Sequence, residues 1–303
     1  MKKVLKLTVI IISVLLIASL ATLFSLSNTL SKRFAKKYKP NTTKIIIPAD
    51  SASIRRGNIL TTALCTNCHG SDLGGIEIFN KPRVGIIYSR NITPGGETKN
   101  FSDADWINAI RFGVREDGTP LFVMPSKDDY NKMSDDDLGC MIAYLKTIKP
   151  SDKNWPLNAH GLTFYGKIFM QTGGLGHSIF SAEKIDMNDN SPRTSPAKKE
   201  TAEYGGYLVS LSDCKYCHGP ELNGGVDTGT TDPPAPNITP GGNLGNWNME
   251  QFIKTIRLGV TPSGKHLNPG YMPWTSIAAF QDTELKAIYA FLKSQPALKD
   301  SKR

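Results

Sequence analysis

The longest apolar stretch of the chain lies near its amino terminus. Positions 7–26 carry no charged side chain and consist mostly of Leu, Ile, Val and Ala. About 20 such residues match one membrane-spanning helix. A cleaved secretory signal is the alternative, but its apolar part is usually shorter, about 7 to 15 residues, and the small residues near Ala18 and Ala21 that could mark a cleavage site lie inside the apolar stretch. The pattern predicts a membrane anchor over residues 1–30, followed by a basic linker over 31–50.

The rest of the chain alternates between apolar segments with helical spacing and polar segments rich in Gly, Pro, Ser and Asn. This periodicity predicts a mostly α protein with two domains of about 100 residues each. The expected boundaries are 51–150 for the first domain and 200–303 for the second. Residues 151–199 are predicted to be a linker with one short packed segment near 162–170.

The two domains repeat one pattern. Each has a glycine eight residues before its first motif cysteine, Gly57 and Gly206. Glycine weakens a helix unless another backbone packs against it, so both are candidates for a close helix contact. Three further features recur in the same order: an Asn-Ile-Thr-Pro-Gly-Gly loop at 91–96 and 237–242, a helix ended by glycine at 106–114 and 252–260, and a closing apolar helix at 134–148 and 282–293.

Each copy also contains one Cys-x-x-Cys-His run, the attachment signature of a c-type haem. Two thiols bond to the vinyl groups of one haem, and the adjacent imidazole is the proximal iron ligand. A zinc site or a redox dithiol is the alternative for a single Cys-x-x-Cys pair, but it leaves both adjacent histidines unexplained. The sequence therefore predicts two covalent c-type haems, held by Cys65, Cys68 and His69 and by Cys214, Cys217 and His218.

A methionine followed by proline is the candidate distal iron ligand in each copy. Met124 comes 55 residues after the first motif histidine, and Met272 comes 54 residues after the second. A thioether favours ferrous iron, raises the reduction potential and fills the sixth coordination site. Ligation by His160, His177 or His266 would instead lower the potential.

The repeat also assigns candidate roles to two arginines and to the fifth cysteine. Arg111 and Arg257 share one repeat position, where a guanidinium would either pair with a haem propionate or lie on a solvated helix face. Cys140 lies in a predicted buried helix, and the second copy has Ala287 at the matching place. Cys140 is therefore expected to be a small core residue.

The formal charge of +9 does not indicate nucleic-acid binding. Eight of the 36 Lys and Arg residues lie in the first 40 positions, and residues 41–303 carry 28 minus 27, or +1. Haem propionates would add about two negative charges per cofactor. No basic surface is then expected for a phosphate backbone.

These motifs, with a closing helix that carries Tyr144 or Phe291, resemble the small monohaem cytochrome c fold in each half. In that family the first and last helices cross at the glycine. The Asn-Ile-Thr-Pro loops and Arg-x-Gly-Val helices resemble more narrowly the membrane-bound dihaem and trihaem cytochromes of quinone-linked alcohol and sugar dehydrogenases. The resemblance covers residues 51–150 and 200–296, and the chain departs from the trihaem subunits in having two haem domains and an amino-terminal anchor.

The expected function is that of a membrane-anchored dihaem electron carrier, which is not itself an enzyme. The resemblance implies a dehydrogenase or quinol oxidiser as electron donor and a cytochrome or oxidase as acceptor. Covalent haem is attached outside the bacterial inner membrane, so the globular part is expected in the periplasm, although the positive-inside rule points weakly the other way. The rivals are a dihaem peroxidase or thiosulfate dehydrogenase, which needs an open iron site, and a haem-based sensor.

Overall fold

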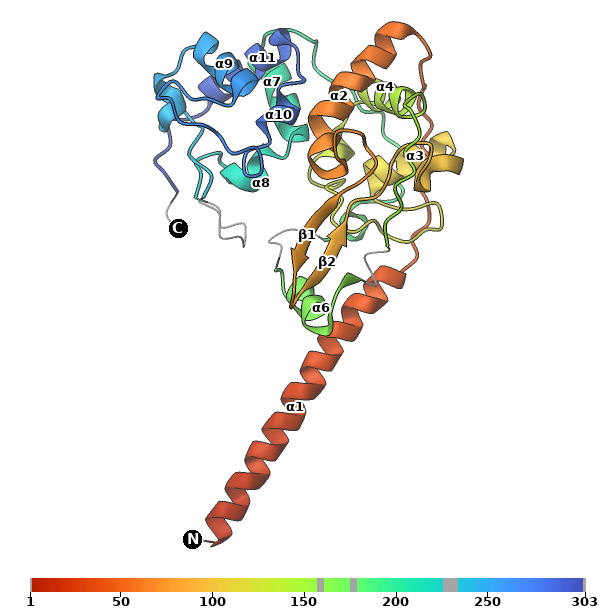
Figure 1. Ribbon diagram of the computed structural model, residues 1–303, viewed down its shortest axis with the longest axis vertical. Coiled ribbons are helices and arrows are strands. Elements are labelled where there is room, and N and C mark those ends of the chain that lie inside the picture. The colour runs from red at the N-terminus through yellow and green to blue at the C-terminus, as the bar shows by residue number, and fades with distance from the viewer. Residues whose placement is uncertain (1, 157–160, 175–178, 226–233, 302–303) are drawn as a thin grey trace.

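A computed structural model describes residues 2–156, 161–174, 179–225 and 234–301 (Figure 1). The fold is mostly α, as predicted. The helices are α1 (Lys2–Ala35), α2 (Ser51–His69), α3 (Asp103–Ile107), α4 (Asp135–Leu145), α6 (Phe164–Gln171), α7 (Ala202–Leu211), α8 (Cys214–His218), α9 (Met249–Leu258), α10 (Trp274–Ile277) and α11 (Asp282–Ser294). One antiparallel hairpin, β1 (Glu77–Lys81) with β2 (Gly85–Tyr88), places Phe79 opposite Ile87.

Helix α1 is long and apolar enough to cross a membrane, and its most apolar part is not buried in the protein. Figure 1 shows it projecting from the first domain. The carboxyl-terminal end of α1, by contrast, packs into that domain. Leu30 is fully buried, and the Phe34 ring contacts Phe122 and Phe180 at centroid distances of 4.9 and 5.0 Å. The helix therefore continues into the predicted linker and is fixed to the domain by apolar packing.

The segment between α1 and α2 is also attached to the first domain. The Asn41 backbone N–H donates to Asn108 Oδ1 at 2.7 Å, and Asn108 Nδ2 donates to Asn41 O at 3.0 Å. Further along, the segment passes so close to α4 that a Cβ on Gly139 would lie 2.3 Å from the Ile46 carbonyl oxygen. These contacts hold an extended segment against the domain surface.

The first and last helices of each domain cross at a glycine. A Cβ on Gly57 of α2 would lie 2.0 Å from the Cys140 carbonyl oxygen of α4. In the second domain, a Cβ on Gly205 of α7 would lie 1.9 Å from the Ala287 carbonyl oxygen of α11, whereas one on Gly206 would meet only the Phe291 ring, at 3.0 Å. The predicted crossing glycine is therefore correct in the first domain and wrong by one residue in the second.

A break in the second copy explains this shift. Helix α2 runs without interruption from its crossing glycine through His69. In the second copy α7 ends at Leu211, and Asp213 adopts a left-handed backbone with φ of 54° before α8 begins at Cys214. The break accommodates one additional residue between the helix crossing and the haem-attachment run.

A buried charge cluster joins the two domains. The Arg56 guanidinium of α2 donates to both carboxylate oxygens of Asp137 in α4, at 2.9 and 3.1 Å. It also pairs with Glu284 of α11 and donates to the Tyr204 hydroxyl of α7 at 3.0 Å. The Tyr207 hydroxyl donates to Asp137 at 2.9 Å. Burial acts to raise the pKa of Asp137, but Arg56 outweighs it and holds that pKa below its ordinary value.

Candidate haem sites

The first Cys-x-x-Cys-His run forms the last turn of α2. Cys65 is buried, Cys68 is exposed and His69 is half-buried. The helix ends at Gly70, whose φ of 78° is accessible to glycine and turns the chain away from the histidine. Burial raises the pKa of Cys65 to about 12.

The second run is the short helix α8. Cys214 and Cys217 are half-buried, His218 is buried, and Gly219 follows with a φ of 83°. Both domains therefore use the same local design, a helical turn that carries two thiols and an imidazole and is ended by glycine.

The two histidines have the same hydrogen-bond partner, a backbone carbonyl. His69 Nδ1 lies 2.8 Å from the Arg90 oxygen, and His218 Nδ1 lies 2.7 Å from the Pro236 oxygen. A carbonyl only accepts, so Nδ1 carries the proton and the Nε2 lone pair remains available for a metal. Burial lowers the pKa of both imidazoles, which favours the neutral form that binds iron.

The repeated Asn-Ile-Thr-Pro loop positions these carbonyls. Its first residue directly follows the carbonyl residue, and its side chain is buried in both domains. Asn91 accepts from the Thr93 backbone N–H at 3.0 Å and donates to the Ser151 carbonyl at 2.7 Å. Asn237 makes the same pair of bonds, with Thr239 at 2.8 Å and with Leu298 at 2.8 Å. Sequence reasoning found the repeated loop but not its role in orienting the histidine.

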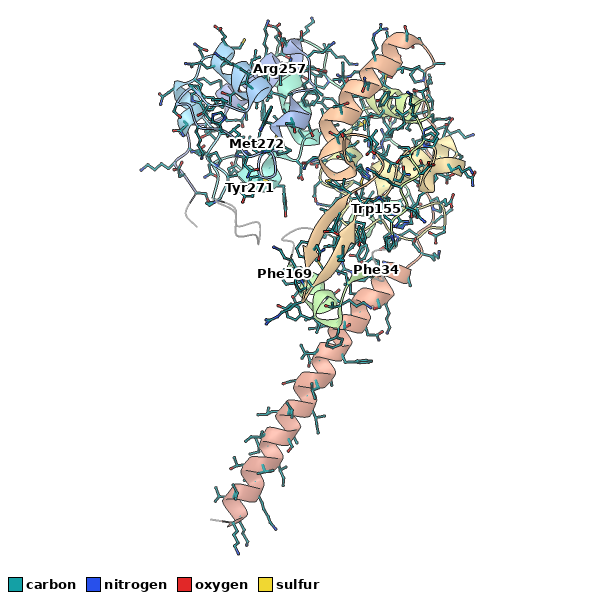
Figure 2. The ribbon with its side chains drawn as sticks, in the orientation of Figure 1. Phe34, Trp155, Phe169, Arg257, Tyr271 and Met272 are labelled. Atoms are coloured by element: carbon teal, nitrogen blue, oxygen red, sulfur yellow. The ribbon has the colours of Figure 1, made fainter. Side chains whose placement is uncertain are left out.

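Met124 and Met272 both lie half-buried against the apolar core. The Ser181 hydroxyl donates to the Met124 carbonyl at 2.6 Å, so the interdomain segment holds the first methionine loop. The Met272 N–H instead donates to the Asn268 carbonyl of its own loop, at 2.9 Å; Figure 2 shows this residue in the second domain.

Of the alternative ligands, His160 and His177 lie outside the described residues. His266 forms an isolated β-bridge with Val260. Axial ligation by Met124 and Met272 remains a prediction.

The repeated arginines pair with the start of the closing helix in each domain. Arg111 is fully buried, and its Nη1 lies 2.8 Å from Asp135, the first residue of α4. Arg257 Nη2 lies 2.7 Å from Asp282, the first residue of α11. Arg111 is thus not on a solvated helix face, and both guanidinium groups have protein partners. A propionate contact for either arginine remains a prediction.

The first domain contains buried donors that suit an anionic group. The Nε atoms of Arg90, Arg111 and Arg115 and the Tyr38 hydroxyl are buried without a hydrogen-bond partner among the described residues. Arg90 supplies the carbonyl that binds the proximal histidine. Burial lowers the pKa of Arg115, and the nearby charge of Arg90 lowers it further while that of Glu97 opposes the shift. Unpaired buried donors are costly, and haem propionates would satisfy them.

Sequence reasoning missed Arg90, Arg115 and Tyr38 because the repeat does not mark them. The second copy has Pro236 and Thr261 at the positions of the two arginines. Donor types and burial in the first domain therefore fit a haem with carboxylate groups.

The two candidate sites approach each other at the domain boundary. Thr66, within the first Cys-x-x-Cys run, is hydrogen-bonded to Ser276 of α10 with 3.0 Å between hydroxyl oxygens. Burial and the charges of Asp213 and Asp129 raise the pKa of Cys214 to about 12, so a carboxylate of the first domain lies near the second attachment run. Figure 1 shows α8 and α10 on the side of the second domain that faces α2.

A family model for cytochrome c matches residues 54–149 and 202–296. The chain is 28% identical over 283 residues to the fructose dehydrogenase cytochrome subunit of Gluconobacter japonicus, covering 84% of this chain and 54% of that relative. It is 27% identical over 288 residues to the cytochrome c subunit of the quinone alcohol dehydrogenase of Gluconacetobacter polyoxogenes, covering 84% and 58%. The chain thus spans a little over half the length of these relatives.

Proposed function

Because the chain belongs to the cytochrome c family, we propose that it is a membrane-anchored carrier of single electrons with one covalent haem in each domain. Membership of the family implies c-type haem. The number of two is supported by the complete attachment run and the carbonyl-bonded histidine present in each domain.

The histidine geometry is the observation that carries this proposal. In both domains the Nδ1–H group donates to a backbone carbonyl, so the lone pair of Nε2 is available to bind a metal, and the histidine directly follows two cysteine thiols in the same helical turn. When bound, haem supplies an iron that changes oxidation state by one electron. The protein fixes the tautomer and orientation of the imidazole through a loop that Asn91 or Asn237 ties to the end of its domain.

The proposed distal ligands decide between a carrier and an enzyme. Met124 and Met272 would close the second axial face of each haem, leaving no coordination site for peroxide or another substrate. The hydrogen bond between Thr66 of the first attachment run and Ser276 of α10 in the second domain supports electron transfer from one domain to the other.

The proposed partners follow from the relatives, which are cytochrome subunits of dehydrogenases. A dehydrogenase or quinol oxidiser would donate electrons, and a downstream cytochrome or oxidase would accept them. Helix α1 would anchor the chain in the bacterial inner membrane, with both haem domains in the periplasm.

The test is ligand exclusion in single methionine variants of the haem-loaded protein. Oxidised protein should show the weak far-red band of methionine-ligated ferric haem at the intensity of two haems. Met124→Ala and Met272→Ala should each halve that band and let one haem bind carbon monoxide, whereas Met187→Ala, a half-buried methionine between the domains, should do neither. Peroxide turnover by the unaltered protein, or unchanged carbon monoxide exclusion in both variants, would refute the proposal.

A further inference from the structure

Helix α6 lies beside the carboxyl-terminal end of α1, just beyond the apolar stretch. Lys167 Nζ of α6 donates to the Ser31 hydroxyl at 3.1 Å, and Arg33 Nη1 donates to Gln171 Oε1 at 2.8 Å. Of these two contacts, the one nearer the start of α6 is also the one nearer the start of α1, so the two helices run in the same direction. The amino-terminal end of α6 therefore points toward the apolar part of α1, and Figure 1 shows α6 at the end of the first domain from which α1 projects.

This end of α6 exposes aromatic side chains. Phe164 and Tyr165 are exposed, while Gly166 and Met170 on the opposite side are buried against the domain. The Tyr165 ring stacks on the Phe169 ring of the next helical turn, with a centroid distance of 6.4 Å, which fixes the orientation of the exposed Tyr165 side chain. The lipid headgroup region favours such aromatic side chains.

The turn of the β1–β2 hairpin adds positive charge at the same end. The Thr163 N–H, which precedes α6, donates to the Val84 carbonyl at 3.0 Å, and its hydroxyl donates to the Arg83 carbonyl. Lys81 and Arg83 are exposed beside this contact, and Lys32 is exposed on α1. The nearby acid Glu183 is already paired with Arg33 at 2.6 Å. The surface is therefore aromatic and basic.

We propose that this surface, the collar formed by Phe164, Tyr165, Lys81, Arg83 and Lys32, rests on the acidic headgroups of the membrane that α1 crosses. The proposal rests on the proposed anchoring by α1. Continuity supports it, because the collar adjoins the point where the apolar stretch of α1 ends. Aromatic and basic side chains are the pair that anionic headgroups bind. The collar and the packed end of α1 together fix the first domain against the bilayer in one orientation, instead of leaving it on a flexible tether.

The test uses the haem-loaded full chain in lipid nanodiscs of phosphatidylethanolamine and phosphatidylglycerol. Tyr165→Cys and Leu258→Cys place a thiol at sites with similar exposed fractions, 54% and 56%, and Leu258 ends α9 in the second domain. Each variant is labelled with a water-soluble maleimide. The labelling rate in nanodiscs is divided by the labelling rate of the same variant in denaturant, which gives a normalised rate for each site. The proposal predicts that Tyr165→Cys reacts about tenfold more slowly than Leu258→Cys, because the interface excludes the reagent. Equal normalised rates would overturn it.

A second set of variants separates lipid from other occupants. Adding Lys81→Glu and Arg83→Glu to Tyr165→Cys should raise its labelling rate at least severalfold, as should nanodiscs of neutral phosphatidylcholine. Shielding that appears only in discs with two copies of the chain, or only in native membranes, would overturn the proposal in favour of a protein partner. Extraction of the chain from membranes by alkaline carbonate would refute the anchoring itself, whereas retention with equal labelling rates would refute only the collar.

Discussion

Replacing Arg56 by methionine tests the buried charge cluster that joins the two domains. The substitution keeps an unbranched side chain but removes the cation between Asp137 and Glu284, whose side chains are 0% and 4% exposed. Removing one member of a buried ion pair usually costs about 3 to 5 kcal/mol, because the remaining charge stays buried. Lys198 remains 3.2 Å from Asp137. We therefore expect a loss near the lower end, about 3 kcal/mol.

The measurement is urea unfolding of the haem-loaded protein followed by far-ultraviolet circular dichroism. Arg55→Met is the matched control, since Arg55 is the exposed neighbour on α2 and should change stability by less than about 0.5 kcal/mol. A double-mutant cycle of Arg56→Met with Glu284→Gln should give a coupling energy above about 1 kcal/mol, because these residues belong to different domains yet contact each other. Additive effects, or a loss below about 1 kcal/mol in Arg56→Met, would refute the assigned role of this cluster.

Three further predictions concern the helix crossings, acid stability and the repeated arginines. Gly57→Ala should lower the free energy of unfolding by more than about 3 kcal/mol because its Cβ would lie 2.0 Å from a carbonyl oxygen, whereas Gly206→Ala should cost less than half as much; similar losses in urea unfolding would contradict this. The pKa of Asp137 in the folded protein lies below its unfolded value of 3.8, so its contribution to stability is complete above pH 3.8 and is lost as the pH falls through the folded pKa. The free energy of unfolding, measured between about pH 5 and pH 2, should therefore fall, and it should fall less in Arg56→Met. The same pH dependence in the variant and the unaltered protein would contradict this. Arg111→Met should cost about 2 to 4 kcal/mol and Arg257→Met less than about 1 kcal/mol, because the first guanidinium is fully buried and the second is partly exposed; equal thermal shifts would show that burial does not set the difference.

Local sequence patterns predicted the apolar helix near the amino terminus and the main helices of each domain in the right order, but they did not identify α6 as a helix and did not predict α10 or the β1–β2 hairpin. The closing helix of the first domain begins as expected at Ser134, whose hydroxyl accepts from the Asp137 N–H at 3.2 Å. Cys140 is a buried core residue, and Ala287 occupies the equivalent place at the second crossing, as the repeat indicated. These features depend on side-chain periodicity and on capping residues a few positions apart, which a sequence displays directly.

Long-range contacts by single side chains could not be predicted in the same way. Residues 31–50 were expected to be a basic linker, but Asn41 binds Asn108 far along the chain, and no periodic pattern marks such a pair. The crossing glycine of the second domain was misplaced because a left-handed residue, Asp213, interrupts the helix and changes the spacing. The pairing of Arg111 with Asp135 had a signal in the sequence, since both residue types recur at matching places in the second copy.

The most direct test of the account is the number of haems covalently attached to each chain. The full-length protein should be matured in a host that attaches c-type haem, then denatured and measured by intact mass and by the haem absorbance per chain. Attachment through both Cys-x-x-Cys-His runs predicts two haems per chain, falling to one when Cys214 and Cys217 are both replaced by alanine. A chain that carries one haem or none would contradict the central claim that each domain holds its own redox centre.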